Sequence, residues 1–265
     1  MQVKMRKLKE SHPILLCLII VIAFWAVSAL TKLIDFNTQE QYATNLAREI
    51  LLSVFAVITA LTLIGKSVLS ERHCSFFRGL SVAAFPIALS AFVILSGILN
   101  PPASLLPLSS IIIFLLFVIL VGIAEEFVFR GSIVNILAEK YAKTEKGVYF
   151  TVFASGILFG AIHLVNIFSG IDILGAVIQA ICVIPIGCLY TAIYLRTKSI
   201  WLLVFTHALN DFGGLVSAGL YGVETIESAI SSYSPLKLVS IILYLIPVFY
   251  LLRKSKVEEI ISKNI

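Results

Sequence analysis

One stretch, from Gly79 to Ala124, contains no charged residue and most constrains what this chain can fold into. Only the Asn-Pro-Pro break at 100–102 and Pro107 divide it, and each half is close to the roughly 20 residues that a helix needs to cross a bilayer. The whole chain is 59% hydrophobic and 13% charged, and that charged fraction is about half of what soluble domains carry. We therefore expect lipid, and not water, to surround this protein.

Similar apolar segments recur along the chain and predict an all-α, polytopic transmembrane helix bundle with about eight spans. The expected spans are Pro13–Thr31, Ile50–Gly65, Leu80–Leu99, Ser109–Tyr141, Val148–Phe168, Ile173–Leu195, Ile200–Leu220 and Leu236–Leu252. No segment between them is long enough to fold alone. We expect a single integral membrane domain over residues 1–265, with a motif-bearing core at about 109–220 and a cytoplasmic tail at 253–265.

The positive charges are distributed unevenly over the two sides of such a bundle. If the amino terminus is inside, one side receives most of the lysines and arginines, and the other side receives only Lys32, Arg48 and Lys237. The positive-inside rule then predicts a multi-pass protein of the cell membrane with both termini in the cytoplasm. This asymmetry accounts for the net charge of +5, so we expect no nucleic-acid partner.

Ionisable side chains inside a span cost about 2.5–3.5 kcal/mol each and therefore call for an explanation. The first group lies between Ala124 and Gly131. Glu126 and Arg130 are four residues apart and share a helix face, so they can form an ion pair. Glu125 is turned about 100° away and stays available as a base. The alternative is a helix end at the interface, where these charges reach water.

Two further spans each carry a histidine. His163 lies well inside the segment 147–171, which contains no Asp, Glu, Lys or Arg. Phe159 lies on the same helix face and is expected to pack. Taken alone, His163 also fits an ordinary hydrogen-bonded core histidine. His207 and Asp211 are four residues apart and project from one helix face, so the carboxylate can orient the imidazole.

Costly polar groups in three separate spans are far less probable as three accidents than as one shared cavity. We expect Glu125 to take a proton from a water molecule that attacks a peptide carbonyl, with His163 positioning that water. His207 and Asp211 would face the developing oxyanion. Support for these four catalytic residues is expected from Glu126, Arg130 and Phe159.

In chain order these motifs read Glu-Glu-x-x-x-Arg, Phe-x-x-x-His and His-x-x-x-Asp. On successive membrane helices over about 111–214, they resemble the CPBP family of CAAX proteases and bacteriocin-processing proteins, also called the Abi family. The resemblance implies an intramembrane glutamic endopeptidase in which Glu125 and His163 activate water and His207 and Asp211 form the oxyanion hole. Family members that process CAAX proteins carry Asn where this chain has Asp211. Because an ionised carboxylate donates no hydrogen bond, Asp211 must be protonated for that role or serve His207 instead.

The same four side chains, Glu125, His163, His207 and Asp211, are also a plausible nitrogen and oxygen ligand set for a divalent metal such as zinc. No span carries a His-Glu-x-x-His pair, and the four cysteines lack a CxxC spacing. We therefore favour a reaction without a metal or another cofactor.

The sequence thus predicts a membrane endopeptidase whose substrate is a membrane-associated peptide or protein, such as a leader or signalling peptide. Glu125 precedes Lys140 by about 15 residues and His207 follows Lys198 by about 9, so we expect a cavity open to the cytoplasm. One alternative is a non-catalytic scaffold or bacteriocin-immunity-type protein of the same fold. Another is a proton-coupled transporter, but the two halves contain no matching broken helices.

Overall fold

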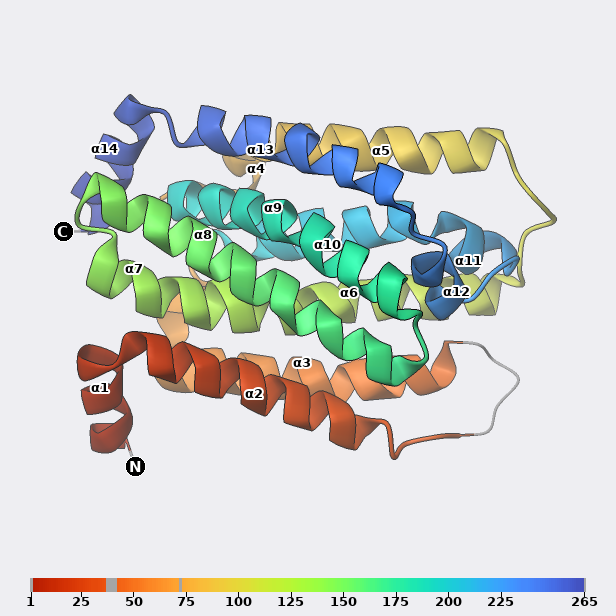
Figure 1. The fold of residues 1–265 in the computed structure, drawn as a ribbon, viewed down its shortest axis with the longest axis horizontal. Helices are drawn as coiled ribbons and strands as arrows, with labels where there is room; N and C mark the ends of the chain where they lie inside the picture. Colours follow the sequence, from red (N-terminus) through yellow and green to blue (C-terminus); the bar gives the residue numbers. More distant parts are fainter. Residues whose placement is uncertain (1, 37–41, 72, 265) are drawn as a thin grey trace.

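The computed structural model describes residues 2–36, 42–71 and 73–264. Within these ranges every regular element is helical, and the long helices run along one common direction (Figure 1). Helices α1 and α14 lie at the same end of the bundle. The prediction of an all-α, polytopic membrane bundle is therefore confirmed.

Each of the eight apolar segments forms a helix. They are α2 (Pro13–Thr31), α3 (Ala43–Leu63), α5 (Ala84–Leu99), α6 (Leu108–Glu126) continued by η2 (Phe127–Val134) and α7 (Asn135–Tyr141), α8 (Glu145–Ile162) with η3 (His163–Ser169), α9 (Ile173–Thr197), α10 (Ile200–Gly214), and η4 (Pro235–Val239) with α13 (Ser240–Leu251). Shorter elements fill the ends: α1 (Gln2–Ser11), η1 (Lys66–Leu69), α4 (Phe76–Gly79), α11 (Val216–Tyr221), α12 (Ile226–Ser231) and α14 (Lys254–Asn264).

Five helices of the described chain are long and apolar enough to cross a membrane. A sixth span arises if Pro235–Leu251 and Lys254–Lys263, which are bent by 63°, are counted as one. Helices α5 and α10 are apolar but shorter, with 16 and 15 residues. The predicted number of about eight spans is compatible with this bundle when these two are included.

Two predicted span boundaries differ from the observed helices. The span expected to begin at Ile50 starts earlier, because α3 begins at Ala43 and so includes Glu49. The span expected over Ile200–Leu220 is divided, because α10 ends at Gly214 and α11 follows it. Apolar runs mark where a helix can meet lipid, whereas a helix continues wherever its backbone hydrogen bonds can be made.

Side-chain caps explain where several of the long helices begin. Thr144 accepts a hydrogen bond from Gly147 N at the start of α8, and Ser199 accepts one from Leu202 N at the start of α10. Asp172 accepts from Leu174 N and Gly175 N at the start of α9. Each cap satisfies backbone donors that have no partner within the helix, which matters most where water is scarce.

Small residues allow the central helices to approach closely. At Gly122 of α6, an added Cβ would lie 3.0 Å from the backbone oxygen of Val204 in α10. At Gly156 of α8, it would lie 2.4 Å from Cys188 Sγ in α9. Glycines at such contacts are typical of helix packing in membranes. The Gly122 contact brings the end of α6 directly against α10.

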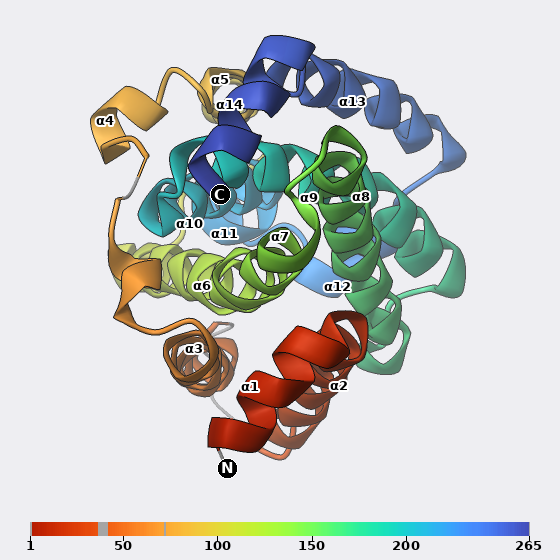
Figure 2. The same cartoon turned by 90° about the vertical axis from the view of Figure 1, so that its left-hand side faces the viewer.

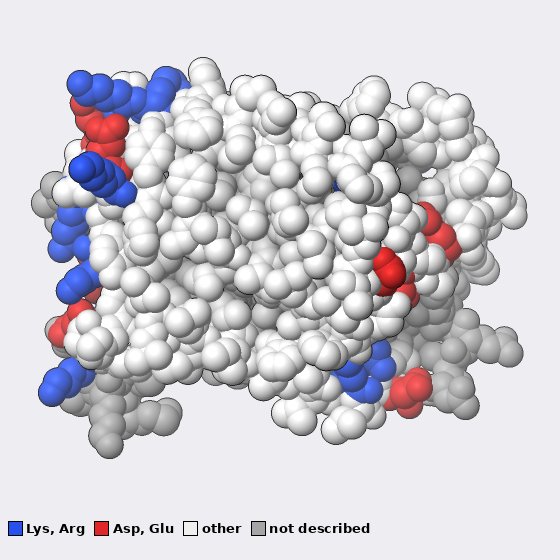
Figure 3. Space-filling view, viewed as in Figure 1, with Lys and Arg blue, Asp and Glu red and all other residues white. Residues whose placement is uncertain are grey.

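The view along the bundle places α9 and α10 near its centre, with α2 and α3 on one side and α5 and α13 on the other (Figure 2). Apolar side chains stay exposed along the flanks, for example Ile58, Phe92 and Ile242, as expected for a surface that faces lipid. Lys and Arg side chains gather at the end that carries α1 and α14 (Figure 3). The described chain is thus organised as a multi-pass membrane protein with one strongly basic end.

Candidate active site

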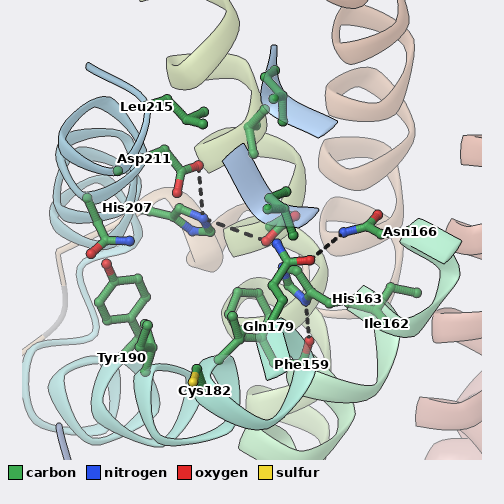
Figure 4. Close-up of a pocket in the computed structure, with 18 of the residues that line it drawn as sticks. Phe159, Ile162, His163, Asn166, Gln179, Cys182, Tyr190, His207, Asp211 and Leu215 are labelled. Atoms are coloured by element: carbon green, nitrogen blue, oxygen red, sulfur yellow. Dashed lines mark hydrogen bonds and ion pairs between the residues drawn. The ribbon is translucent and has the colours of Figure 1, made fainter. Parts of the chain in front are cut away.

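A cavity of about 550 Å³ lies between the central helices, and all four predicted catalytic residues line it. Glu125 comes from α6, His163 from the junction of α8 and η3, and His207 and Asp211 from α10. Phe159 also lines the cavity, whereas Glu126 and Arg130 lie behind its wall. Figure 4 shows the labelled side chains converging on this space. Residues from three separate spans thus meet in one place.

The ion pair predicted from the four-residue spacing is present. Arg130 Nη1 donates to Glu126 Oε1 at 2.9 Å, and both side chains are completely buried. Arg130 Nη2 donates to Gly187 O of α9 at 2.9 Å. The guanidinium also lies over the rings of Phe159 and Tyr190, at 4.5 and 5.3 Å from their centroids. Arg130 therefore joins three central helices through one planar group.

The helix changes its geometry directly after this pair of glutamates. Residues Phe127–Val134 form a π-helix, in which hydrogen bonds reach five residues back. Asn135 Nδ2 donates to the backbone oxygens of Arg130 and Gly131 and to the Tyr194 hydroxyl. This network ties the end of the π-helix to α9. Such π segments occur often at functional sites, and nothing in the sequence predicted this one.

His207 is held from behind by Glu126. Its Nδ1 lies 2.7 Å from Glu126 Oε1, and because this carboxylate is already the partner of Arg130, Nδ1 is the donor. Its Nε2 faces the cavity, at 3.6 Å from Glu125 Oε2 and 3.4 Å from Asp211 Oδ2. Glu126 therefore fixes the orientation of the imidazole. From the sequence, this role was expected only for Asp211.

Glu125 and Glu126 are neighbours in sequence but have different surroundings. Glu126 Oε1 accepts hydrogen bonds from both Arg130 and His207. The Oε2 atom of each carboxylate is buried and has no hydrogen-bond partner among the described residues. The Glu125 side chain is 19% exposed, toward the cavity. Of the two carboxylates, only Glu125 can meet a molecule that enters the cavity.

His163 is oriented by the helix that carries it. Its Nδ1 lies 2.8 Å from the backbone oxygen of Phe159, and because a carbonyl oxygen can only accept, Nδ1 carries the hydrogen. The other nitrogen, Nε2, is then an acceptor when the ring is neutral. Phe159 packs edge-on against the rings of His163 and His207 at 5.3 and 5.9 Å. Phe159 therefore sets the positions of both histidines, consistent with the packing role expected for it.

The described residues offer little for a metal ion. No three His, Cys, Asp or Glu side chains in that part of the chain converge as ligands of one ion. His207 uses Nδ1 for Glu126 and keeps Nε2 between two carboxylates, while His163 belongs to another element. As placed here, the described side chains offer one ion fewer than three such ligands, and the steps proposed below use no metal.

Several cavity residues were missed by the sequence analysis. Glu49 of α3 lines the same cavity and is close enough to interact electrostatically with Glu125 and Asp211. It was overlooked because the predicted span began one residue later, although an ionisable residue beside an apolar run is itself a signal. Two amides, Asn166 and Gln179, also line the cavity. Uncharged polar residues are common enough in spans that the sequence alone gave no reason to single them out.

The cavity lies toward one end of the bundle. Besides residues of α5, α6, α9 and α13, its lining comes from the later turns of α2, α8 and α10, from the early turns of α3, and from η3, α12 and η4. In Figure 1 these parts lie in the half away from α1 and α14. The described lining residues do not extend to Lys140 or Lys198. This position differs from the expected cavity, which was to open at the end where those two lysines lie.

Comparisons with known proteins find one family that is similar to the motif-bearing part of the chain. Residues 107–213 match the family described as type II CAAX prenyl endopeptidase Rce1-like, and this match covers less than half of the chain. No curated protein matches the chain. The matched segment begins just before α6 and ends in the last turn of α10, so it contains all three motifs. Residues 107–213 of this membrane protein are therefore similar to the Rce1-like CAAX prenyl endopeptidases, in agreement with the resemblance that the order of the motifs predicted.

Proposed function

We propose that this protein is an intramembrane endopeptidase that hydrolyses a membrane-associated peptide or protein, with Glu125 as the base. The observation that supports this most is the difference between the two adjacent glutamates. Glu126 is completely buried and its Oε1 is engaged by Arg130 and His207, whereas the Glu125 side chain is 19% exposed and lines the cavity. A carboxylate placed in this way can accept a proton from a water molecule.

In the proposed reaction, Glu125 takes a proton from water while the water oxygen attacks the carbonyl carbon of the scissile bond. His163 positions this water through Nε2, because Nδ1 is committed to the Phe159 carbonyl. The tetrahedral intermediate collapses when its C–N bond breaks, and the leaving nitrogen takes the proton back from Glu125. The products are a carboxylic acid and an amine, which become a carboxylate and an ammonium when the acid gives its proton to the amine, so one water is consumed for each bond cut.

The oxyanion of this intermediate would face His207. In its imidazolium form, Nε2 carries a hydrogen that faces two carboxylates, with Glu125 Oε2 at 3.6 Å and Asp211 Oδ2 at 3.4 Å. Both distances are longer than a good hydrogen bond, so this N–H can turn to a developing oxyanion. Asp211 then serves mainly by stabilising the charge on His207, which is the second of the two roles that the sequence left open.

The substrate would enter from the bilayer between α5 and α13. Helix α5 packs mainly on α10, and α13 packs mainly on α9. The Phe85–Tyr244 ring pair, at 6.1 Å, joins the two helices. Val93 of α5 and Leu243 of α13 line the cavity and are 39% and 43% exposed, and Phe92 and Ile242 beside them are 70% and 65% exposed. A lipid-facing wall that is also a cavity wall is suited to a substrate that is itself dissolved in the membrane.

If both termini are cytoplasmic, the end of the bundle nearest the cavity faces the outside of the cell. This orientation predicts that Val223→Cys, between α11 and α12, is labelled by an impermeant maleimide on intact cells. Lys143→Cys, between α7 and α8, should be labelled only after the cells are opened. The background is Cys74→Ser, because the other three native cysteines are buried. The opposite labelling pattern would show that the termini face the outside of the cell and that the cavity lies toward the cytoplasm.

The activity itself can be tested with purified protein in liposomes and a pool of quenched-fluorescent peptides, some farnesylated and some plain. We expect cleavage of at least one apolar peptide, with fragments identified by mass spectrometry. Cleavage should persist in the presence of a zinc chelator, because the proposed steps use only Glu125, His163, His207 and Asp211. A stoichiometric metal whose removal stops cleavage would contradict the metal-free mechanism.

The second candidate function is a non-catalytic scaffold that binds a peptide in the same cavity. The cavity itself favours this alternative, because it would hold a peptide whether or not hydrolysis follows. Wild-type protein that binds peptides from the pool but cuts none would support the scaffold over the protease.

A further inference from the structure

A pair of amide side chains lies in the cavity, apart from the residues assigned to hydrolysis. Asn166 of η3 donates through Nδ2 to Oε1 of Gln179 in α9, at 2.9 Å. Both side chains are half-buried and line the cavity. In Figure 4 Asn166 and His207 lie on opposite sides of His163. We call Asn166 and Gln179 the amide pair.

The bond within the amide pair leaves much of its hydrogen-bonding capacity unused. An amide side chain has two N–H donors and an oxygen with two lone pairs. Asn166 Oδ1 and Gln179 Nε2 make no hydrogen bond with any other described residue. Neither atom is fully buried, so a molecule in the cavity can reach both of them. If both amide groups were rotated by 180°, the two residues would exchange their donor and acceptor roles, and the pair would still present one free acceptor and one free donor.

The surroundings make unused polar groups costly. Ile162, Cys182 and Val183 line the same cavity, and the first two are almost completely buried. A polar group that stays unpaired in such a place costs about 1–3 kcal/mol. If the pair served only to join η3 to α9, two side chains whose polar groups were all hydrogen-bonded would stabilise the protein more. The unused groups therefore point to a ligand that supplies an acceptor and a donor together.

A peptide main chain is such a ligand, because each residue presents an N–H and a C=O. Inside a membrane these groups find no water, so a peptide that is unfolded for cleavage needs partners from the protein. Main-chain contacts of this type hold many sequences equally well, while side-chain pockets select among them.

We propose that the amide pair binds the main chain of the substrate next to the bond that is cut, with Gln179 donating to a peptide carbonyl and Asn166 accepting from a peptide N–H. This inference rests on the proposed endopeptidase function. The pair is a positioning element: it holds the peptide across the cavity while Glu125 and His163 act on the neighbouring carbonyl.

The test uses the peptide that wild-type protein cleaves fastest in liposomes. Gln179→Leu and Asn166→Leu are each expected to raise KM about tenfold, the loss typical of one hydrogen bond in an apolar site, with kcat changed much less. Asn45→Leu is the matched control, because this amide on α3 does not line the cavity, and it should leave KM unchanged. Thermal unfolding shows whether each variant folds.

A set of N-methylated peptides sharpens the assignment, because each lacks one main-chain N–H. At one position, methylation should raise KM about tenfold for the wild type and have no further effect on Asn166→Leu. Equal losses in both proteins at every position would overturn the role of Asn166. Variants that fold and keep the wild-type KM would overturn the whole proposal while leaving the protease intact.

Binding to the inactive Glu125→Gln protein separates this proposal from the proposed function. If wild type cuts no peptide but fluorescein-labelled peptides from the pool bind, Gln179→Leu in the Glu125→Gln background should still weaken their Kd about tenfold. That result would retain the peptide subsite and reject the protease. If no peptide is cut and none binds, both proposals fall.

Discussion

Glu125→Gln is expected to lower peptide hydrolysis by about 10²–10⁴-fold, the range typical of a removed general base. The amide keeps the size and polarity of the carboxyl group but cannot take a proton from water. Because Glu125 Oε2 has no hydrogen-bond partner among the described residues and lies 3.6 Å from His207 Nε2, its replacement should disturb the fold little. Release of the quenched fluorophore in liposomes measures the loss, and peptide binding should remain.

The control for this experiment is Glu145→Gln, an exposed carboxylate at the start of α8, which should keep full activity. Thermal unfolding of both variants should match the wild type. A Glu125→Gln protein that folds normally and cuts peptides at the wild-type rate would remove Glu125 from the chemistry, and with it the mechanism proposed above.

Arg130→Met is expected to destabilise the protein by about 3–5 kcal/mol, because it leaves a buried carboxylate without its cation. Arg130 is completely buried and bonds to Glu126 and to Gly187 O, and it lies over Phe159. Methionine fills similar space but replaces none of these interactions. The midpoint of thermal unfolding in detergent measures the loss, with tryptophan fluorescence as the signal.

Two further variants identify the cause of that loss. Arg253→Met also removes an arginine over a tyrosine ring, but at an exposed position, and should change stability by less than about 0.5 kcal/mol. The double variant Glu126→Gln/Arg130→Met should recover part of the stability lost in Arg130→Met, because no charge is then left unpaired. An Arg130→Met protein as stable as the wild type would contradict this account of the buried pair.

The contacts that could be predicted from the sequence are those within one helix. The four-residue spacing was enough to predict the Glu126–Arg130 ion pair, because helix geometry fixes which side chains share a face. The same reasoning placed His207 near Asp211, and Nε2 does lie 3.4 Å from that carboxylate. Helical periodicity carries this information without any knowledge of the tertiary structure.

Contacts between helices could not be obtained in this way. The bond between Glu126 and His207 joins residues 81 positions apart, and it depends on the close approach of α6 and α10 at Gly122. The π-helix after Glu126 has a sequence that would also form an ordinary α-helix, so helical periodicity could not predict it. Glu49 was lost because the expected span began at an apolar residue, although the helix itself begins at Ala43.

The contrast between the two walls of the cavity also has a dynamic consequence. Helices α6 and α10 are joined by the buried contacts of Glu126 with Arg130 and His207. At Gly122 the two helices also pack closely against each other. Helices α5 and α13 are short, and the Phe85–Tyr244 ring pair joins them across the entrance. Slow opening motions should therefore be concentrated in α5 and α13, so that the admission of a substrate need not disturb the residues that act on it.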